Sequence, residues 1–170
     1  PSPRKLKEAD EKKLTAALKG YFSADEKKRA RWKFSRSLDK LLAGNEEAVR
    51  ALVWKAYLEA TLHSARKEDF DKRQVRFKTH LSPYTLKNVG KRPEGGWPLF
   101  IAMHGGGGVP KRINDSQWRH MQIYYRDQPS VTGYRYLALR APNDTWNGFY
   151  ADYVYPLVEN LVRQFLVFGD

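Results

Sequence analysis

The fold of this chain is decided by the stretch Pro98-Leu99-Phe100-Ile101-Ala102-Met103-His104-Gly105-Gly106-Gly107-Gly108. Its first six residues form a continuous apolar run, which is typical of a strand buried on both faces. A helix is expected from Asp115 to about Tyr125, then a strand over 134–140 and a helix over roughly 150–167. This order of elements predicts an α/β fold with a mostly parallel sheet.

The residues before this stretch predict a β-hairpin. Apolar and polar side chains alternate over 75–79, which indicates a half-buried strand. Ser82-Pro83 is expected to break this strand, and residues 84–90 can form a second one before a turn rich in Pro and Gly at 91–96. The sheet is therefore expected to begin with an antiparallel pair.

The first 70 residues have helical periodicity. Three helices are expected, over about 3–19 with Gly20 closing it, from the capping box Ser23-Ala24-Asp25-Glu26 to Leu42, and from Asn45 to about His63. The chain is therefore predicted to have a helical N-terminal extension over 1–70 and the first part of an α/β domain over 71–170.

Composition limits the other options. The chain has 170 residues and no cysteine, so it has neither disulfides nor a thiolate metal site, and no metal or organic cofactor is expected. It has no run of 18 apolar residues, and its first ten residues lack the apolar core of a signal peptide. No membrane partner is therefore expected.

The net charge of +12 raises the question of a polyanionic partner. The charge is uneven, with 24 Lys/Arg against 13 Asp/Glu in residues 1–97 and seven against six in 98–170. A basic run comprises Lys27, Lys28, Arg29, Arg31, Lys33 and Arg36. This run could bind the phosphates of a nucleic acid. However, Ala30, Trp32 and Phe34 interrupt it, and a helix needs such apolar residues in order to pack. This favours a solvated helix face. Nucleic acid is therefore not expected as a partner.

Four consecutive glycines after a buried strand leave backbone N–H groups unshielded at the carboxyl end of the sheet, where α/β folds place ligands. The spacing fits neither a P-loop nor a dinucleotide fingerprint. Binding of an oxyanion is the preferred role, and a flexible connection is the alternative.

Trp97 to Gly107 resembles the strand and loop that build the oxyanion hole in esterases and lipases of the α/β-hydrolase fold. The resemblance covers about 74–170, with the hairpin at 74–90 as the antiparallel pair that precedes the oxyanion strand. It implies an oxyanion hole formed by His104, Gly105, Gly106 and Gly107. In this motif the glycine N–H groups stabilise the oxyanion, and the histidine shapes the loop and is not the general base.

The resemblance also implies a triad of Ser, Asp or Glu, and His downstream of this loop. The sequence contains no Gly-x-Ser-x-Gly. We therefore assign no catalytic residue within the chain and expect the nucleophile on a C-terminal segment or a second chain. Ser116, with His120 four residues later, is a competing nucleophile, but Asn114-Asp115-Ser116 is explained more simply as a helix N-cap.

Asp144 and Trp146 are the candidate residues of a substrate pocket, because their loop should face the site. Asn143 and Asp144 could instead form an Asx turn or a helix cap. Trp146 could form a wall of the pocket beside an acyl or aryl group, or it could simply pack against other residues. Trp118 is expected in the core.

The resemblance therefore predicts the N-terminal portion of a serine hydrolase that acts on a small ester or amide. An esterase-like acyl hydrolase is the preferred activity, and a peptidase is the second option. The chain alone should be inactive. The strand ending near Arg140 should leave an exposed edge that the partner segment covers. The alternative is a noncatalytic basic module that binds a polyanion such as nucleic acid.

Overall fold

The computed structural model of the chain describes residues 6–169, and these divide into two compact units between Ser64 and Ala65. The first unit is helical and contains α1 (Glu8–Ser23), α2 (Glu26–Ala30), α3 (Arg36–Gly44), α4 (Glu46–Leu58) and the 3₁₀ helix η1 (Thr61–His63). Its core is apolar and consists of Leu14, Leu18, Leu38, Val49 and Ala56.

The helix bounds differ from the sequence expectations for local reasons. Gly20 does not end α1; it lies inside the helix, where a Cβ would stand 3.3 Å from Cη2 of Trp32. The expected start near residue 3 lies outside the described residues. Asp25, and not Ser23, caps α2 by accepting a hydrogen bond from Lys28 N at 2.9 Å.

The single helix expected up to Leu42 is also two helices. α2 ends at Ala30, and α3 begins after Ser35, whose Oγ accepts a hydrogen bond from Leu38 N at 3.4 Å. The third expected helix stops at Leu58 and is followed by η1.

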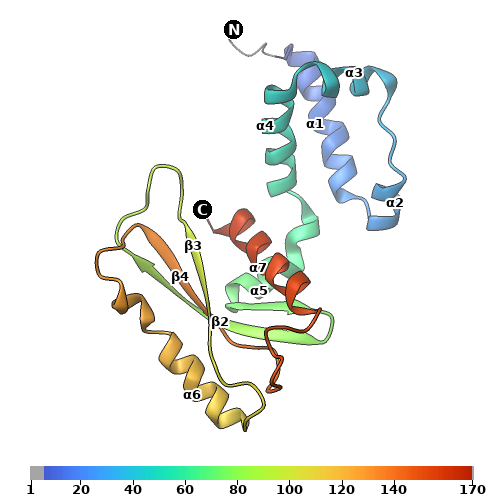
Figure 1. Ribbon diagram of the computed structural model, residues 1–170. Helices are drawn as coiled ribbons and strands as arrows, with labels where there is room; N and C mark the ends of the chain where they lie inside the picture. The colour runs from blue at the N-terminus through green and yellow to red at the C-terminus, as the bar shows by residue number, and fades with distance from the viewer. Residues whose placement is uncertain (1–5, 170) are drawn as a thin grey trace. The chain divides into compact units, whose positions relative to one another are not determined.

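The second unit is an α/β unit with a four-stranded mixed sheet, which confirms the expected α/β class (Figure 1). The expectation of a mostly parallel sheet is wrong, because β3 and β4 form the one parallel pair among the described strands. It contains α5 (Ser64–Asp71), β1 (Gln74–Phe77), β2 (His80–Val89), β3 (Leu99–Met103), α6 (Lys111–Met121), the 3₁₀ helix η2 (Tyr124–Asp127), β4 (Tyr134–Leu139) and α7 (Val154–Phe168). The strand order is β1-β2-β4-β3, with β3 and β4 parallel and the other pairs antiparallel.

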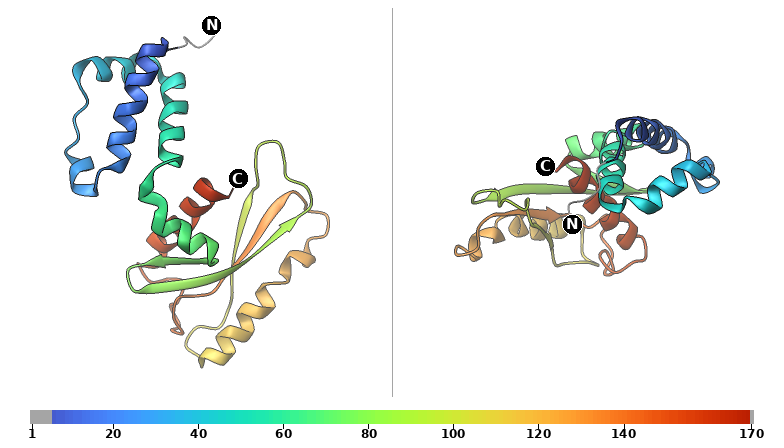
Figure 2. Two further views of the ribbon diagram at one scale, coloured as in Figure 1. Left: turned by 180° about the vertical axis from the view of Figure 1, so that it is seen from behind. Right: turned by 90° about the horizontal axis from the view of Figure 1, so that it is seen from above.

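β2 runs continuously from its hairpin with β1 to its pairing with β4 (Figure 2). The expectation that Ser82-Pro83 breaks the strand is wrong. Pro83 is tolerated because β2 changes partner there: Gln74 is opposite Pro83, and Leu139 is opposite Tyr84. A proline has no N–H to donate, and a change of partner is a position where the ladder does not need one.

The sheet carries a helix on each face. Leu137 and Leu139 of β4 pack with Leu157 and Leu161 of α7. The alternate residues of β4, including Tyr136 and Ala138, belong to a cluster with Trp118 and Met121 of α6. The alternation follows from the two-residue period of a strand.

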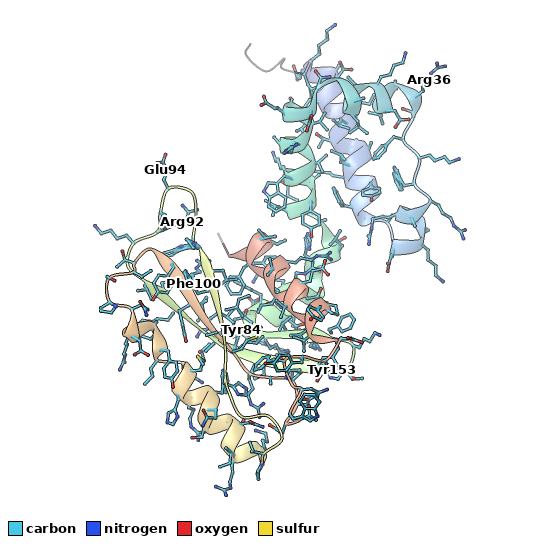
Figure 3. The ribbon with its side chains drawn as sticks, viewed as in Figure 1. Arg36, Tyr84, Arg92, Glu94, Phe100 and Tyr153 are labelled. Carbon is cyan, nitrogen blue, oxygen red and sulfur yellow. The ribbon has the colours of Figure 1, made fainter. Side chains whose placement is uncertain are left out.

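Two expectations about the strands are wrong. β4 lies between β2 and β3 and is not an edge, and β3 is not buried on both faces. Within the described residues β3 pairs with β4 alone, and Phe100 and Met103 are half exposed. Phe100 is labelled on β3 in Figure 3. None of the helices in residues 6–169 is long and apolar enough to cross a membrane.

Candidate functional site

The glycine loop, residues 104–108, connects β3 to α6 and lines a cavity of about 370 Å³. The opposite wall comes from the segment that connects β4 to α7. The lining residues are Met103, His104, Gly105, Gly106, Gly107, Asn114, Ala141, Asn143, Thr145, Trp146, Gly148, Phe149 and Tyr150. None of them carries a charged Asp, Glu, Lys or Arg side chain, so the cavity suits an uncharged group.

Glycine is required at two positions of this loop. Gly106 has φ +111° and Gly107 has φ +101°, values that residues with a Cβ rarely adopt. A Cβ on Gly106 would overlap Asn114 Oδ1, and one on Gly107 would stand 2.9 Å from the Cα of Trp146. The backbone of the loop therefore approaches α6 on one side and the 140–153 segment on the other.

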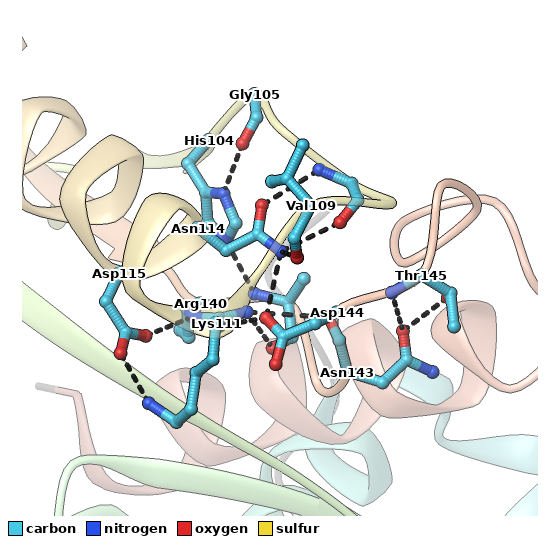
Figure 4. Close-up of polar contacts among 12 residues, drawn as sticks. His104, Gly105, Val109, Lys111, Asn114, Asp115, Arg140, Asn143, Asp144 and Thr145 are labelled. Atoms are coloured by element: carbon cyan, nitrogen blue, oxygen red, sulfur yellow. Dashed lines mark hydrogen bonds and ion pairs between the residues drawn. The ribbon is translucent and has the colours of Figure 1, made fainter.

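The three candidate N–H donors of the loop are not equivalent. The side chain of Asn114 accepts a hydrogen bond through Oδ1 (Figure 4). The donor is Gly107 N–H at 2.9 Å, so Gly107 N–H is engaged within the protein, and its expected role toward an oxyanion stays a prediction. Within the described residues, no hydrogen bond engages the N–H of Gly105 or Gly106. Gly105 and Gly106 are therefore the glycines of the cavity lining whose N–H groups are free.

Asn114 fixes the loop and was missed in the sequence. Its side chain is 1% exposed, and Nδ2 donates to Gly107 O at 2.8 Å and to Asp144 Oδ1 at 2.9 Å. The expected N-cap at Asn114-Asp115-Ser116 is wrong, because α6 begins at Lys111 and Pro110 is its N-cap. A polar run near a predicted helix start is usually a cap, and no local pattern distinguishes a side chain that instead binds a loop seven residues away.

His104 is buried, with both ring nitrogens in contact with polar backbone atoms. Nε2 accepts a hydrogen bond from Ala141 N–H at 3.0 Å, so the proton is assigned to Nδ1, which lies 2.6 Å from Gly105 O and donates to it. Burial lowers the pKa of the ring below its usual value. A neutral ring without a free nitrogen positions the loop and is a poor general base.

A buried guanidinium supports the second wall. Arg140 follows β4, is 6% exposed, and donates from Nε to Asp115 Oδ1 at 3.0 Å and from Nη2 to Asp144 Oδ1. The hydrogen bond from Arg140 is the main reason why the pKa of Asp144 lies below its usual value. Asp144 thus joins Arg140 and Asn114 behind the glycine loop and is not among the residues that line the cavity.

Trp146 does line the cavity, and its side chain is 78% exposed. Phe149 and Tyr150 accompany it, so one wall is aromatic. Asn143 forms the expected Asx turn, with Oδ1 accepting from Thr145 Oγ1 at 2.7 Å and from Thr145 N at 3.4 Å. Trp118 is partly buried against the sheet and donates from Nε1 to Ala138 O at 2.9 Å.

The described residues do not contain a complete hydrolytic centre. Ser116 lies inside α6 and does not line the cavity, and no hydrogen bond joins it to His120. In residues 6–169 no cluster of three or more His, Cys, Asp or Glu side chains could hold a metal ion. The site therefore consists of a glycine loop with free N–H groups, a neutral cavity and the polar network that holds them.

Comparison with known proteins adds no relative to this picture, since no protein-family model, no curated protein and no solved structure matches the chain.

Proposed function

We propose that this chain is the N-terminal portion of a serine hydrolase of the α/β-hydrolase fold, and that it supplies the oxyanion hole for cleavage of an ester. The observation that carries the proposal is the pair of unpartnered N–H groups at Gly105 and Gly106, in a glycine loop that lines a cavity. In hydrolases of this fold, the oxyanion donors include an N–H from the loop between the third strand and the next helix. The glycine loop occupies that position, between β3 and α6.

The architecture supports the same proposal. The sheet starts with two antiparallel pairings and ends with the parallel pair β4 and β3. β3, which leads into the glycine loop, has no second neighbour within the described residues. A further parallel strand beside β3 would bring its carboxyl end next to Gly105 and Gly106. We place the nucleophile there, on a C-terminal segment or a second chain.

In the proposed reaction, the serine oxygen of that segment attacks the carbonyl carbon while a histidine of the same segment accepts the hydroxyl proton. The carbonyl oxygen becomes an anion, which accepts hydrogen bonds from Gly105 and Gly106 and from the N–H after the nucleophile. Collapse of this tetrahedral intermediate expels the alcohol, which takes the proton from the histidine. Water then hydrolyses the acyl-serine and releases the acid. His104 cannot replace this base, because its Nε2 already accepts from Ala141.

The cavity fits a small ester or amide without charge near the carbonyl, because its lining is neutral and partly aromatic. An acyl or aryl group can pack against Trp146 and Tyr150, which are 78% and 76% exposed. We propose an ester ahead of a peptide because the exposed aromatic side chains Trp146 and Tyr150 offer a flat apolar surface for an acyl or aryl group.

The test is labelling with a fluorophosphonate, which reacts with activated serines. Material captured from the natural source through this chain should show a labelled serine on a polypeptide or segment outside residues 1–170, and it should hydrolyse a p-nitrophenyl ester. The isolated 170-residue chain should show neither. If the captured material is inert in both assays, the proposal is wrong; if Ser116 itself is labelled, the placement of the nucleophile is wrong.

The loop is tested in the assembled enzyme by Gly106→Pro, which removes one donor. Ester turnover should fall on the order of 100- to 1000-fold. The control is Gly95→Ala in the same unit, where a Cβ meets open space, and turnover should be unchanged. A circular dichroism spectrum separates loss of activity from loss of folding, and full turnover by a folded Gly106→Pro enzyme would exclude the loop as the oxyanion hole.

A further inference from the structure

The basic run of the helical unit does not lie on one continuous helix. α2 ends at Ala30, and residues 31–35 connect it to α3 without helical structure. The side chains of Lys27, Lys28, Arg31, Trp32 and Lys33 line a cleft of about 460 Å³, which we call the basic cleft. The run was assigned to a solvated helix face because one packed helix was expected to continue through Trp32. That continuous helix does not form, so the reason for the assignment is absent.

The cations of the basic cleft have few acidic neighbours. Residues 27–33 contain five Lys/Arg and no Asp or Glu. Lys28 forms an exposed ion pair with Asp25 at 3.6 Å, which contributes little in water. Within the described residues, Lys27, Arg31 and Lys33 have no ion pair. Positive charge is thus gathered in a hollow without internal compensation, which attracts anions.

Trp32 provides the cleft with an aromatic surface. Its ring is held in place by Gly20, whose missing side chain leaves the space, and by an edge-to-face contact with Tyr21 at 5.8 Å between centroids. The side chain nevertheless remains 36% exposed, and it lines the cleft between the cations. A tryptophan that is anchored on one part and open on another can stack on a flat ligand.

We propose that the basic cleft binds single-stranded nucleic acid, with a base stacked on Trp32 and the flanking phosphates near Lys27, Arg31 and Lys33. Stacking on an aromatic side chain within a cationic groove is the general mode by which proteins bind single strands. The basic cleft is shallow and open to solvent, so a base can reach the exposed part of Trp32 without entering an enclosed pocket.

Two other polyanions fit this surface less well. Duplex DNA is read by an element that enters a groove, and α2 has five residues. An anionic membrane surface is bound by an amphipathic helix with a large apolar face, and α2 (Glu-Lys-Lys-Arg-Ala) carries no large apolar side chain. The proposal is independent of the oxyanion site, since the two features lie in different units and require different ligands.

The experiment measures fluorescence anisotropy of a labelled thymidine oligonucleotide of about 12 nucleotides with the full 170-residue chain, in salt from about 50 to 200 mM. We expect saturable binding that weakens steeply with salt. Replacement of two cations in Arg31→Ala/Lys33→Ala should reduce the slope of log affinity against log salt by about 1.4, because each contact with a single strand contributes about 0.7. Lys7→Ala/Lys40→Ala removes the same charge from exposed positions outside the cleft and should leave the slope nearly unchanged.

Stacking is tested separately with Trp32→Leu and Trp32→Phe. The Leu variant should bind on the order of tenfold more weakly at constant salt, while Phe, which keeps a ring, should lose less. Thermal melts show whether either variant has lost its fold, and the charge variants test the cleft without touching Trp32.

The proposal is overturned if the oligonucleotide does not bind, or if both double variants reduce the salt slope equally. It is also overturned if a duplex of the same length binds more tightly than the single strand, or if vesicles of phosphatidylcholine with phosphatidylserine compete the oligonucleotide away. None of these results changes the expected labelling by fluorophosphonate, so the two proposals fail separately.

Discussion

Gly106 is the position where the backbone conformation and the available space both exclude a side chain. Its φ is +111°, and a Cβ would overlap the oxygen by which Asn114 binds Gly107 N–H. We expect Gly106→Ala to lower the free energy of unfolding by about 1–3 kcal/mol in urea titrations, because of backbone strain and loss of that hydrogen bond. Gly95→Ala, where a Cβ meets open space, should change it by less than about 0.5 kcal/mol. Equal effects would contradict the loop geometry.

His104 should make stability depend on pH. Burial lowers the pKa of its ring in the folded chain, so the unfolded chain binds the proton more readily. The contribution of His104 is complete above the unfolded pKa of about 6.5 and is lost as the pH falls through the lower folded pKa. Urea titrations between about pH 7.5 and 5 should therefore show stability falling with pH, less steeply in His104→Gln than in the wild type.

The control for this pH effect is His120→Gln, because His120 lies exposed on α6. Comparison of the His104→Gln and His120→Gln profiles isolates the effect of the buried ring. A His104→Gln profile identical to the wild-type profile would show that the ring is not held neutral by burial.

At the scale of the elements, Arg140 ties β4 to α6. Its buried guanidinium donates to Asp115 on α6 and to Asp144 in the segment after β4. We expect Arg140→Ala to cost about 3 kcal/mol of unfolding free energy, because Asp115 and Asp144 each lose a buried charged partner, keeping Lys111 and Asn114 respectively, and a buried space opens. Arg163→Ala removes an exposed ion pair with Glu159 on α7 and should cost less than about 1 kcal/mol. The comparison fails if the two variants unfold at the same urea concentration.

The elements that carry strong periodicity were predicted from the sequence. β3, β4 and α7 lie close to the expected ranges, because a continuous apolar run and an amphipathic helix are long signals that tertiary contacts rarely override. The α/β class followed from their order.

The errors lie where tertiary contacts decide. Lys78 takes the left-handed conformation, φ 54°, in the two-residue turn between Phe77 and His80, although lysine is not a turn-forming residue. Gly20 was assigned as a helix end and instead accommodates Trp32. In the candidate site, the glycine loop and Trp146 could be located from the sequence, whereas Asn114 and Arg140 could not, because their partners lie on other elements.

At the scale of the whole molecule, the sheet of the α/β unit has an exposed edge at β3. Within the described residues, β3 pairs on one side only, and it carries two half-exposed apolar side chains, Phe100 at 50% and Met103 at 41%. A long apolar edge of this kind pairs readily with another strand. The exposed apolar edge of the sheet therefore lies at β3, whereas the sequence had predicted it at β4.

We expect the purified 170-residue chain to associate, with itself or with the segment that completes the sheet, through this edge. Phe100→Lys/Met103→Lys places a charge on each face of β3 and should shift the sedimentation profile toward the monomer, because a strand that pairs there would bury both ammonium groups. Leu166→Lys puts the same charge on an exposed apolar position of α7 and should leave association unchanged. A wild-type chain that sediments as a monomer and unfolds in one cooperative, highly stable transition would mean that the four strands suffice, and that no further strand is required beside the glycine loop.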